Sequence, residues 1–345
     1  MKKDIRAYGY EELQKEMATI GEKAFRAKQI YEWLHVKLVD HFDEMTNLSK
    51  ALREKLEENY EILPVVMLER QISQIDGTNK FLFRLYDGNV VESVLMKYKH
   101  GNSICVSTQV GCRMGCKFCA STIGGRIRDL SSGEILAQIM VAQRYLGERI
   151  SNVVLMGSGE PLDNFDNVIN AVKIINNPKG LNIGARHISI STSGLVPMIY
   201  KLAEQNTQCT LSISLHATTN EKRSSMMPVN NAYNIEELIQ ACKDYIKVTN
   251  RRISFEYALA KDNNDNLEDA KRLVKLLKGM LCHVNLIPIN KIENGEYTKS
   301  SNENIIKFRD YLNDHGIVAT IRRELGSDID AACGQLRRKN LKEEK

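Results

Sequence analysis

Residues 112–119 read CRMGCKFC, which places Cys112, Cys116 and Cys119 in a CxxxCxxC spacing. Three thiolate ligands leave one iron of a cubane iron–sulfur cluster with an open coordination position, and metal chemistry needs an open position. A structural zinc ion would require a fourth ligand close by. The nearest upstream candidates, Cys105 and then His100, lie beyond a plausible loop distance. The spacing therefore predicts a [4Fe–4S] cluster that is held by these three cysteines.

Strand-like and helix-like segments alternate from about residue 100 onward. The candidate strands are Ser103–Ser107, Asn152–Met156, His187–Ser191, Thr210–Leu215, Ile253–Ala258, His283–Pro288 and Val318–Arg322. One candidate helix starts at the capping box formed by Ser131 and Glu134. The other candidate helices between the strands lie near Asn164–Asn176, Val196–Gln205, Ile235–Val248, Leu267–Lys278 and Glu303–Asp314. Such alternation means parallel strands with right-handed crossovers. Six or seven units favour an α/β fold with a partial barrel of the (β/α)6 type over residues 100–325, rather than a closed eightfold barrel.

The chain before residue 100 has a different pattern. Residues 1–62 have apolar positions at helical spacing and few β-branched residues, so we expect a small helical accessory domain. Residues 63–99 alternate like strands, with turn signals at 76–77 and 87–88, and predict a short antiparallel β appendage. The last segment, 326–345, follows the final predicted strand.

The composition is typical of a globular intracellular protein. Of 345 residues, 43% are hydrophobic and 26% are charged. The N-terminal lysines precede no apolar run, and no stretch of about 18 apolar residues occurs, so we expect a cytoplasmic protein without membrane spans. The eight cysteines are then expected to be reduced thiols, metal ligands or catalytic groups. The net charge of +5 permits a polyanionic partner without demanding one.

Further candidate residues stand where the predicted strands end. They are Gly159 and Glu160 after the second strand, Ser191 after the third, Ser214, Leu215 and His216 after the fourth, and Asn290 after the sixth. Because the loops after barrel strands converge on one face, these residues should lie together. Each motif alone has an ordinary alternative, such as a simple turn for the glycine segment or a satisfied polar residue for His216. Together, in register on one face, they indicate a ligand site.

The cysteine loop and these motifs resemble the radical SAM superfamily, whose members cleave S-adenosylmethionine (SAM) at a [4Fe–4S] cluster. The resemblance includes Phe118, the aromatic residue before the last cysteine, which in the superfamily packs by the adenine of SAM. It implies that Gly159 and Glu160 belong to the segment that binds the amino group of the SAM methionine. The further SAM-binding residues that it implies are Ser191, Ser214, Leu215, His216 and Asn290.

Two outlying cysteines narrow the resemblance to one family. Cys105 lies in ICVSTQVGC at 104–112 and Cys333 in GSDIDAACGQL at 326–336. With SLHA at 214–217 and FRAKQIYEWL at 25–34, these segments closely resemble the bacterial dual-specificity adenine-C2 methyltransferases of 23S ribosomal RNA and transfer RNA. A related antibiotic-resistance family, which methylates adenine C8, shares the same chemical residues. Its cluster loop and following segment differ from ASTIGGRI at 120–127, which favours C2. The alternative of another class is a non-catalytic RNA-binding protein with a zinc-stabilised loop.

The resemblance implies roles for three more residues. Cys333 takes a methyl group from one SAM, and radical cleavage of a second SAM lets the resulting methylene add to adenine, so that two SAM molecules are used per turnover. Glu92 matches the family's proton acceptor, and Cys105 attacks the sulfur of Cys333 in a transient disulfide that frees the RNA. From the residues alone, the alternative for Cys105 is a buried strand cysteine, and the alternative for Glu92 is a surface strand residue.

The resemblance also implies partners. The RNA substrates are 23S ribosomal RNA and transfer RNA, which the helical segment 1–62 is expected to bind. Electrons are expected from a low-potential donor such as flavodoxin or ferredoxin, and the chain is expected to act as a monomer. Cys209, Cys242 and Cys282 are interpreted as buried thiols away from the active face.

Overall fold

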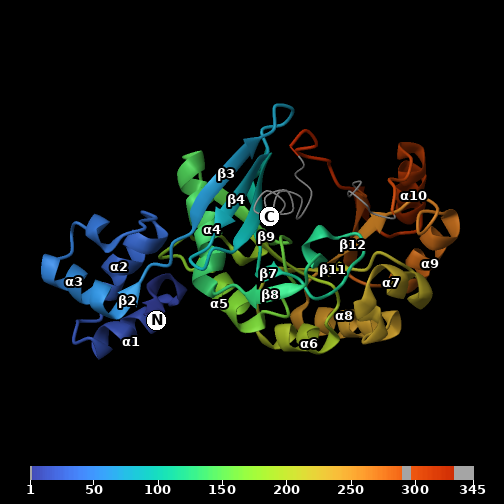
Figure 1. Ribbon diagram of the computed structural model, residues 1–345. Helices are drawn as coiled ribbons and strands as arrows, with labels where there is room; N and C mark the ends of the chain where they lie inside the picture. The colour runs from blue at the N-terminus through green and yellow to red at the C-terminus, as the bar shows by residue number, and fades with distance from the viewer. Residues whose placement is uncertain (1, 290–296, 330–345) are drawn as a thin grey trace.

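A ten-stranded sheet forms the centre of the computed structural model, which describes residues 2–289 and 297–329 (Figure 1). The strands are β3 Val66–Ile72, β4 Asn79–Arg84, β5 Val90–Tyr98, β6 Gly101–Cys105, β9 Ile150–Leu155, β10 Ile188–Thr192, β11 Thr210–Ser214, β12 Ile253–Leu259, β13 Cys282–Pro288 and β14 Ala319–Ile321. Their order in the sheet is β14-β13-β12-β11-β10-β9-β6-β5-β4-β3. Strands that neighbour each other in the sheet therefore follow one another along the chain.

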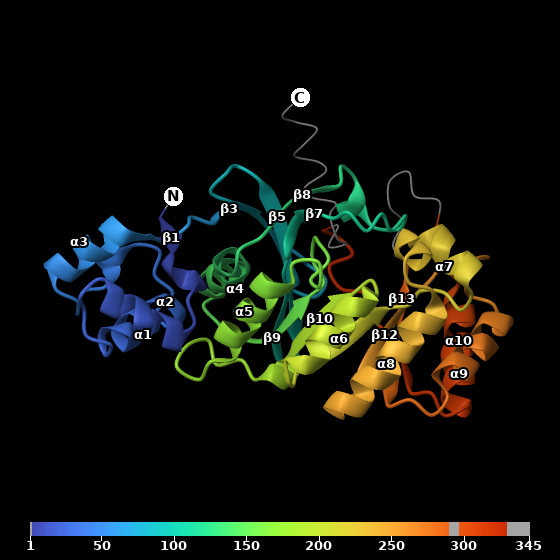
Figure 2. The same cartoon turned by 90° about the horizontal axis from the view of Figure 1, so that it is seen from below.

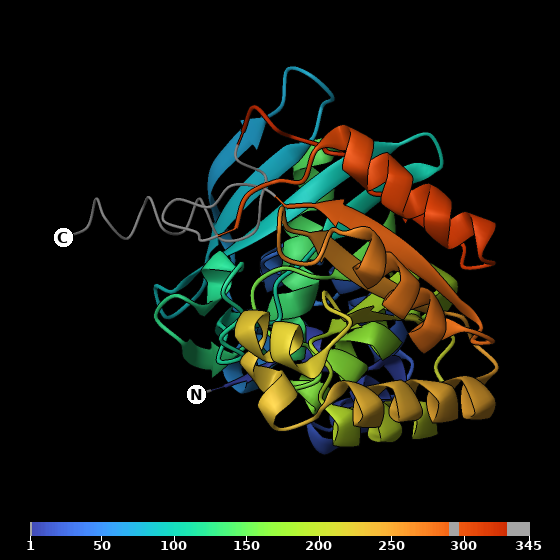
Figure 3. The same cartoon turned by 90° about the vertical axis from the view of Figure 1, so that its right-hand side faces the viewer.

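The parallel part of the sheet confirms the predicted α/β partial barrel. Strands β6 and β9 to β14 are parallel to one another. Between them run α4 Ser132–Leu146, α5 Phe165–Asn176, α6 Val196–Glu204, α8 Ile235–Thr249, α9 Leu267–Leu277 and α10 Asn302–Asp314. These helices cover the outer side of the curved sheet (Figures 2 and 3). No helix within 2–289 or 297–329 has the length and apolar character needed to cross a membrane.

Side chains alternate between the two faces of the parallel strands. Ile190, Ile213 and Phe255 are completely buried in the core that the sheet forms with its outer helices. Ser214 and Glu256, which are register partners on β11 and β12, occupy alternate positions and so point to the inner face. A parallel sheet that is covered on both faces is apolar almost throughout each strand. The polar inner face here therefore indicates a sheet that lines a site.

The antiparallel strands β3, β4 and β5 belong to the same sheet. The sequence predicts them as a short antiparallel appendage that leads into the main domain, and the pairing of β5 with β6 over residues 94–98 and 101–105 joins these hairpins to the barrel sheet. The predicted turn signals are confirmed, since residues 73–78 connect β3 to β4 and residues 85–89 connect β4 to β5. The register between β5 and β6 is a long-range property that alternation within one strand does not encode.

Three helices before the sheet form a group beside α4 and α5 (Figures 1 and 2). They are α1 Tyr10–Thr19, α2 Arg26–His35 and α3 Lys50–Asn59, with a short parallel pair, β1 Lys3–Asp4 and β2 Tyr60–Glu61. Polar side chains of the barrel helices hold this group. Arg144 Nη1 donates to the Leu38 carbonyl at 3.0 Å and forms an ion pair with Asp40. Asn170 Nδ2 donates to the Ala7 carbonyl at 2.7 Å.

His35 lies buried at the edge of this contact, where α2 meets the loop after α5. A methyl group placed on Gly180 of that loop would lie 3.0 Å from the His35 Cβ, so the two segments are in close contact. The ring packs against Tyr31 with 4.3 Å between centroids, and neither ring nitrogen has a hydrogen-bond partner among the described residues. Burial, helped by the charge of Arg6, lowers the pKa of His35 to about 3. The imidazole is therefore neutral in the folded chain at neutral pH.

Acidification from pH 7 to pH 5 should destabilise the chain through His35. Below about pH 6.5 the unfolded chain gains a proton on this residue that the folded chain does not accept. The contribution of His35 to the free energy of unfolding is thus fully present above pH 6.5 and is lost as the pH falls toward the folded pKa of about 3. At pH 5 the loss is about 2 kcal/mol. Urea unfolding at pH 7, 6 and 5 measures the slope. His35→Leu should remove this part of it, and the same substitution at the exposed His41 should not.

Candidate active site

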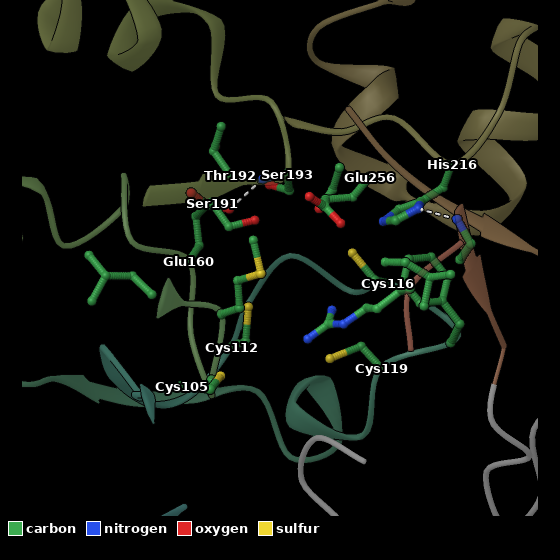
Figure 4. A pocket seen from close by; sticks show the side chains of 18 of the residues that line it. Cys105, Cys112, Cys116, Cys119, Glu160, Ser191, Thr192, Ser193, His216 and Glu256 are labelled. Atoms are coloured by element: carbon green, nitrogen blue, oxygen red, sulfur yellow. Dashed lines mark hydrogen bonds between the residues drawn. The ribbon is translucent and has the colours of Figure 1, made fainter. Parts of the chain in front are cut away.

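The cysteine loop leaves the sheet through a small ribbon that the sequence did not predict. After β6, strands β7 Gln109–Gly111 and β8 Arg126–Asp129 pair antiparallel on either side of the loop. The loop thus faces a cavity of about 350 Å3 at the carboxyl ends of the parallel strands. Cys112, Cys116 and Cys119 all line this cavity, and so does Cys105 from the end of β6 (Figure 4).

The surroundings of the three loop cysteines are apolar. Cys116 packs with Met226, the last residue of the short helix α7 Asn220–Met226, and with Met227 and Val229, which follow that helix. Burial raises the pKa of Cys112 to about 12 and also raises the pKa of Cys116 and Cys119. A thiolate in such a place needs a strong positive charge beside it, and a bound metal centre supplies one.

The chemistry of this donor set fits an iron–sulfur cluster. Cys112, Cys116 and Cys119 line one cavity, and thiolates are the ligands that such clusters take. A structural zinc ion would take four protein ligands. Three irons of a [4Fe–4S] cluster would bind these cysteines, which leaves the fourth iron open.

The glycine segment after β9 passes directly against the chain that leaves β6. A Cβ on Gly157 would lie 2.7 Å from the backbone nitrogen of Ser107, and one on Gly159 would lie 2.7 Å from that of Gln109. Gly159 also has φ of +107°, which side chains disfavour. The close approach lets the Glu160 backbone N–H donate to Gln109 Oε1 at 2.9 Å. Both glycines are thus required to bring Glu160 to the cavity.

The carboxylate of Glu160 is a buried acceptor at the cavity wall. Its Oε2 accepts from the Ser193 backbone N–H at 2.7 Å and its Oε1 from that of Leu162 at 3.0 Å. Burial raises the pKa of Glu160, and a positively charged ligand would oppose that shift. Beside it, the Ser193 hydroxyl is buried and has no hydrogen-bond partner among the described residues. A carboxylate and a free hydroxyl at one wall fit the ammonium group of an amino acid.

The motif after β11 places a neutral histidine opposite the cysteines. His216 Nδ1 accepts from the Ala258 backbone N–H at 2.9 Å, so the proton resides on Nε2. Burial, with the charge of Arg223, lowers the pKa of His216 to about 3. The ring meets Phe118 edge to face at 4.9 Å between centroids, and both residues line the cavity. They form an apolar corner with one N–H donor, which suits a flat heterocycle.

A buried arginine, Arg223, fixes the ends of two strands. Its Nη2 donates to the carbonyl oxygens of Ser193 at 2.6 Å and Ser214 at 3.1 Å, and its Nε donates to that of Leu215 at 3.2 Å. The guanidinium is completely buried. These bonds hold the segments after β10 and β11 at a constant separation, which sets the width of the cavity between them.

The remaining predicted residues fall into four groups. Ser191 and Ser214 line the cavity, whereas the Leu215 side chain is completely buried and does not line it. Asn290 and Cys333 lie outside the described residues. Glu92 is buried on β5 with the Lys80 Nζ 4.0 Å from its Oε1, so its interpretation as a surface residue is wrong.

Glu92 has a cavity-lining neighbour on its own strand. It shares a strand face with Val94, two residues along, and Val94 lines the cavity.

Glu256 is a cavity residue that the sequence reasoning missed. Its carboxylate accepts from Ser254 Oγ at 3.1 Å and from Asn285 Nδ2 at 2.8 Å. Burial raises its pKa. Figure 4 shows it between the Ser193 segment and His216, facing the cysteines. The signal that could have found it is the alternation of polar residues at 254 and 256 within an otherwise apolar strand.

Comparison with known proteins agrees with this geometry. A partial barrel with a three-cysteine loop at the carboxyl ends of its strands defines the radical SAM class, and the family model "Radical SAM superfamily" matches residues 106–277. Residues 4–62 match "Ribosomal RNA large subunit methyltransferase N-terminal domain". The solved "radical SAM methyltransferase from Sphaerobacter thermophilus" is 42% identical, with a TM-score of 0.92 over 96% of this chain and 98% of that one.

Curated relatives specify the family. The chain is 57% identical over 340 residues to the "Probable dual-specificity RNA methyltransferase RlmN" of Clostridium novyi, which covers 99% of both chains. It is 58% identical to the protein of the same name from Clostridium botulinum (strain Alaska E43), over 99% of this chain and 98% of that one. The chain therefore belongs to the RlmN family of dual-specificity RNA methyltransferases. Members of this family use a [4Fe–4S] cluster and two SAM molecules per turnover.

Proposed function

We propose that this chain methylates C2 of an adenine in 23S ribosomal RNA and in transfer RNA. The observation that carries the proposal is Cys105, a fourth thiol that lines the same cavity as the three cluster cysteines. A cluster-binding loop explains Cys112, Cys116 and Cys119 but leaves no role for a further cysteine. Transfer of a methyl group through a protein thiol does need a second thiol, because the adduct must be resolved.

Covalent catalysis answers a specific chemical difficulty. C2 of adenine is not nucleophilic, so direct displacement of the SAM methyl group fails. The Cys333 thiolate instead takes the methyl group from one SAM, and S-adenosylhomocysteine leaves. The cluster, held by its three cysteines, would supply the electron that cleaves a second SAM to methionine and a 5′-deoxyadenosyl radical. Loss of one hydrogen atom to that radical turns the methyl group on Cys333 into a methylene radical, which adds to C2. Splitting one inaccessible step in this way is the use of covalent catalysis.

Two side chains then complete the transfer. The adduct radical would lose one electron to the oxidised cluster, and its C2 proton goes to Glu92. The Cys105 thiolate attacks the sulfur of Cys333, so that an S–S bond forms while the S–CH2 bond breaks. The electron pair stays on the methylene carbon, which takes a proton and becomes the methyl group of the product. Two electrons from a thiol reductant reduce the disulfide and restore both cysteines. A low-potential donor such as flavodoxin or ferredoxin would supply electrons to the cluster.

The cavity residues divide between the two parts of SAM. The Glu160 carboxylate and the Ser193 hydroxyl would bind its ammonium group, because they are a buried acceptor and a free polar group at one wall. His216 and Phe118 would lie against its adenine, and Ser191, Ser214 and Asn290 would complete the site.

We further propose that the helical segment 1–62 binds the RNA as an accessory domain. The chain would then act as a monomer on its substrates.

The experiment that tests the function identifies the modified nucleoside. Cells that lack the endogenous activity are complemented with this chain, and nucleosides from purified 23S ribosomal RNA and transfer RNA are separated by mass spectrometry. We expect 2-methyladenosine in both RNAs, with none from cells carrying Cys112→Ala. Detection of 8-methyladenosine would instead assign the chain to C8 chemistry. A chain that binds zinc and modifies neither RNA would overturn enzymatic function altogether.

A further inference from the structure

The segment after β14 forms part of the cavity wall. Residues 322–328 are defined here as the strap, and four of them, Arg322, Arg323, Glu324 and Leu325, line the cavity. The strap starts at the sheet, where the Arg322 backbone N–H donates to the Leu286 carbonyl at 2.8 Å. It then leaves β14 and crosses toward the β3–β4 hairpin (Figures 1 and 3). The strap therefore connects the two opposite ends of the ten-stranded sheet.

The far end of the strap is bound to the hairpin turn by three hydrogen bonds. Ser73 Oγ donates to Asp328 Oδ1 at 2.6 Å, and the backbone N–H of residue 74 donates to Asp328 Oδ2 at 2.8 Å. The Gly326 backbone N–H donates to Asp76 Oδ2 at 2.8 Å. These three bonds are called the clasp. The bond from Ser73 lowers the pKa of Asp328, so this carboxylate is charged at neutral pH.

The hairpin side of the clasp also has hydrogen bonds of its own. Ser73 Oγ accepts from the backbone N–H groups of Ile75 at 3.2 Å and Asp76 at 3.3 Å. Asp76 Oδ1 accepts from the Thr78 backbone N–H at 2.9 Å. Such side-chain to backbone bonds hold a turn in one conformation. The turn therefore presents a donor and an acceptor at set positions, as a binding site for the strap does.

We infer that the clasp is a positioning device for the segment that carries Cys333. The inference rests on the proposed role of Cys333 as methyl carrier. Cys333 follows Asp328 by five residues, so its Cα lies at most about 18 Å from that of Asp328. Without the clasp, the last point fixed by the sheet is Arg322, eleven residues before Cys333, and the reach grows to about 40 Å. The exposed ion pair between Lys299 and Glu324 adds little restraint in between.

A shorter tether raises the effective concentration of the Cys333 thiol at the cavity. Effective concentration falls roughly as the −3/2 power of tether length, so lengthening from five to eleven residues lowers it about threefold. A less well oriented Cys333 thiol should lower the rate further, because small misplacements of reacting groups can reduce rates by about 100-fold. The clasp residues touch no reacting atom, so their effect should appear only in steps that need Cys333.

The test measures the position of Cys333 without RNA. The reconstituted chain is equilibrated with reduced and oxidised glutathione, and the Cys105–Cys333 disulfide is quantified by peptide mass spectrometry, which gives the effective concentration of the two thiols. We expect Asp328→Ala and Ser73→Ala to lower it at least threefold. Gln74→Ala is the matched control, since its backbone N–H still binds Asp328, and Ser73→Thr should restore the parent value.

A second readout connects the clasp to turnover. Cleavage of SAM to 5′-deoxyadenosine without RNA should stay within twofold in Asp328→Ala, whereas the rate of RNA methylation should fall at least threefold. The inference is overturned if Asp328→Ala matches Gln74→Ala in both disulfide equilibrium and methylation, or if SAM cleavage falls equally. If the parent chain makes no 2-methyladenosine, the proposed function fails, and the disulfide equilibrium still decides whether the clasp positions Cys333.

Discussion

Cys105→Ala should accumulate a covalent complex of the chain with RNA, whereas Cys333→Ala should form none. Removal of Cys105 leaves the methyl carrier and the cluster loop in place and deletes only the thiol that resolves the adduct. The methylene of Cys333 then stays bonded to adenine. A denaturing gel after boiling and nuclease trimming should show a shifted band in most of the Cys105→Ala chains, and turnover should fall by more than about 100-fold.

The double variant distinguishes the two cysteines. Cys105→Ala combined with Cys333→Ala should show no shifted band, because no carrier remains, while SAM cleavage persists. Normal turnover of Cys105→Ala would make Cys105 a simple core cysteine, despite its place in the cavity wall. Methylation of RNA by Cys333→Ala would assign the chain a different chemistry.

Replacement of any one of Cys112, Cys116 or Cys119 by Ala should abolish iron retention and SAM cleavage. A cubane with two protein ligands is poorly held, and the buried position offers no replacement donor. Iron and sulfide content after anaerobic reconstitution, together with the visible absorption band, measures the first effect. Formation of 5′-deoxyadenosine measures the second, and we expect it to fall below about one hundredth of the parent rate.

The matched control for the cluster variants is Cys282→Ala. Cys282 is half-buried at the first position of β13, at the opposite end of the strand from the cavity. Its replacement should leave iron content unchanged. A cluster-loop variant that kept full iron and full turnover, like this control, would contradict the assignment of the three ligands.

Much of the barrel could be predicted because its signals are local. The expected strand 210–215 corresponds to β11, and the expected helix 164–176 to α5, each within one residue. The capping box at Ser131 and Glu134 does open α4. Apolar periodicity and helix caps are encoded within a few residues, so a single segment is enough to show them.

The parts that escaped prediction depend on distant segments. The ribbon β7–β8 has short strands separated by the cysteine loop, and neither strand shows a pattern alone. The pairing of β5 with β6 depends on register, and the clasp joins residues at least 250 positions apart. Glu256 escaped because a lone acidic residue in a strand gains meaning only when Asn285 and His216 are placed around it.

Of the predicted site residues, the structure brings nine to one cavity: Cys105, Cys112, Cys116, Cys119, Gly159, Glu160, Ser191, Ser214 and His216. Their roles stay predictions until the variants above are measured. The disulfide expected between Cys105 and Cys333 involves a residue outside the described ranges. Cys112, Cys116, Cys119, Cys209, Cys242 and Cys282, which lie within those ranges, are free thiols.

The contact between the N-terminal helices and the barrel has an evolutionary consequence. Arg144 and Asn170 bind the carbonyl oxygens at positions 38 and 7, and every amino acid supplies a carbonyl. The side chains at those two positions can therefore diverge while the acceptors stay in place. The barrel side has no such freedom, because its donors are side chains. A lineage could thus remodel the outer surface of the helical segment and still inherit the same attachment to the barrel.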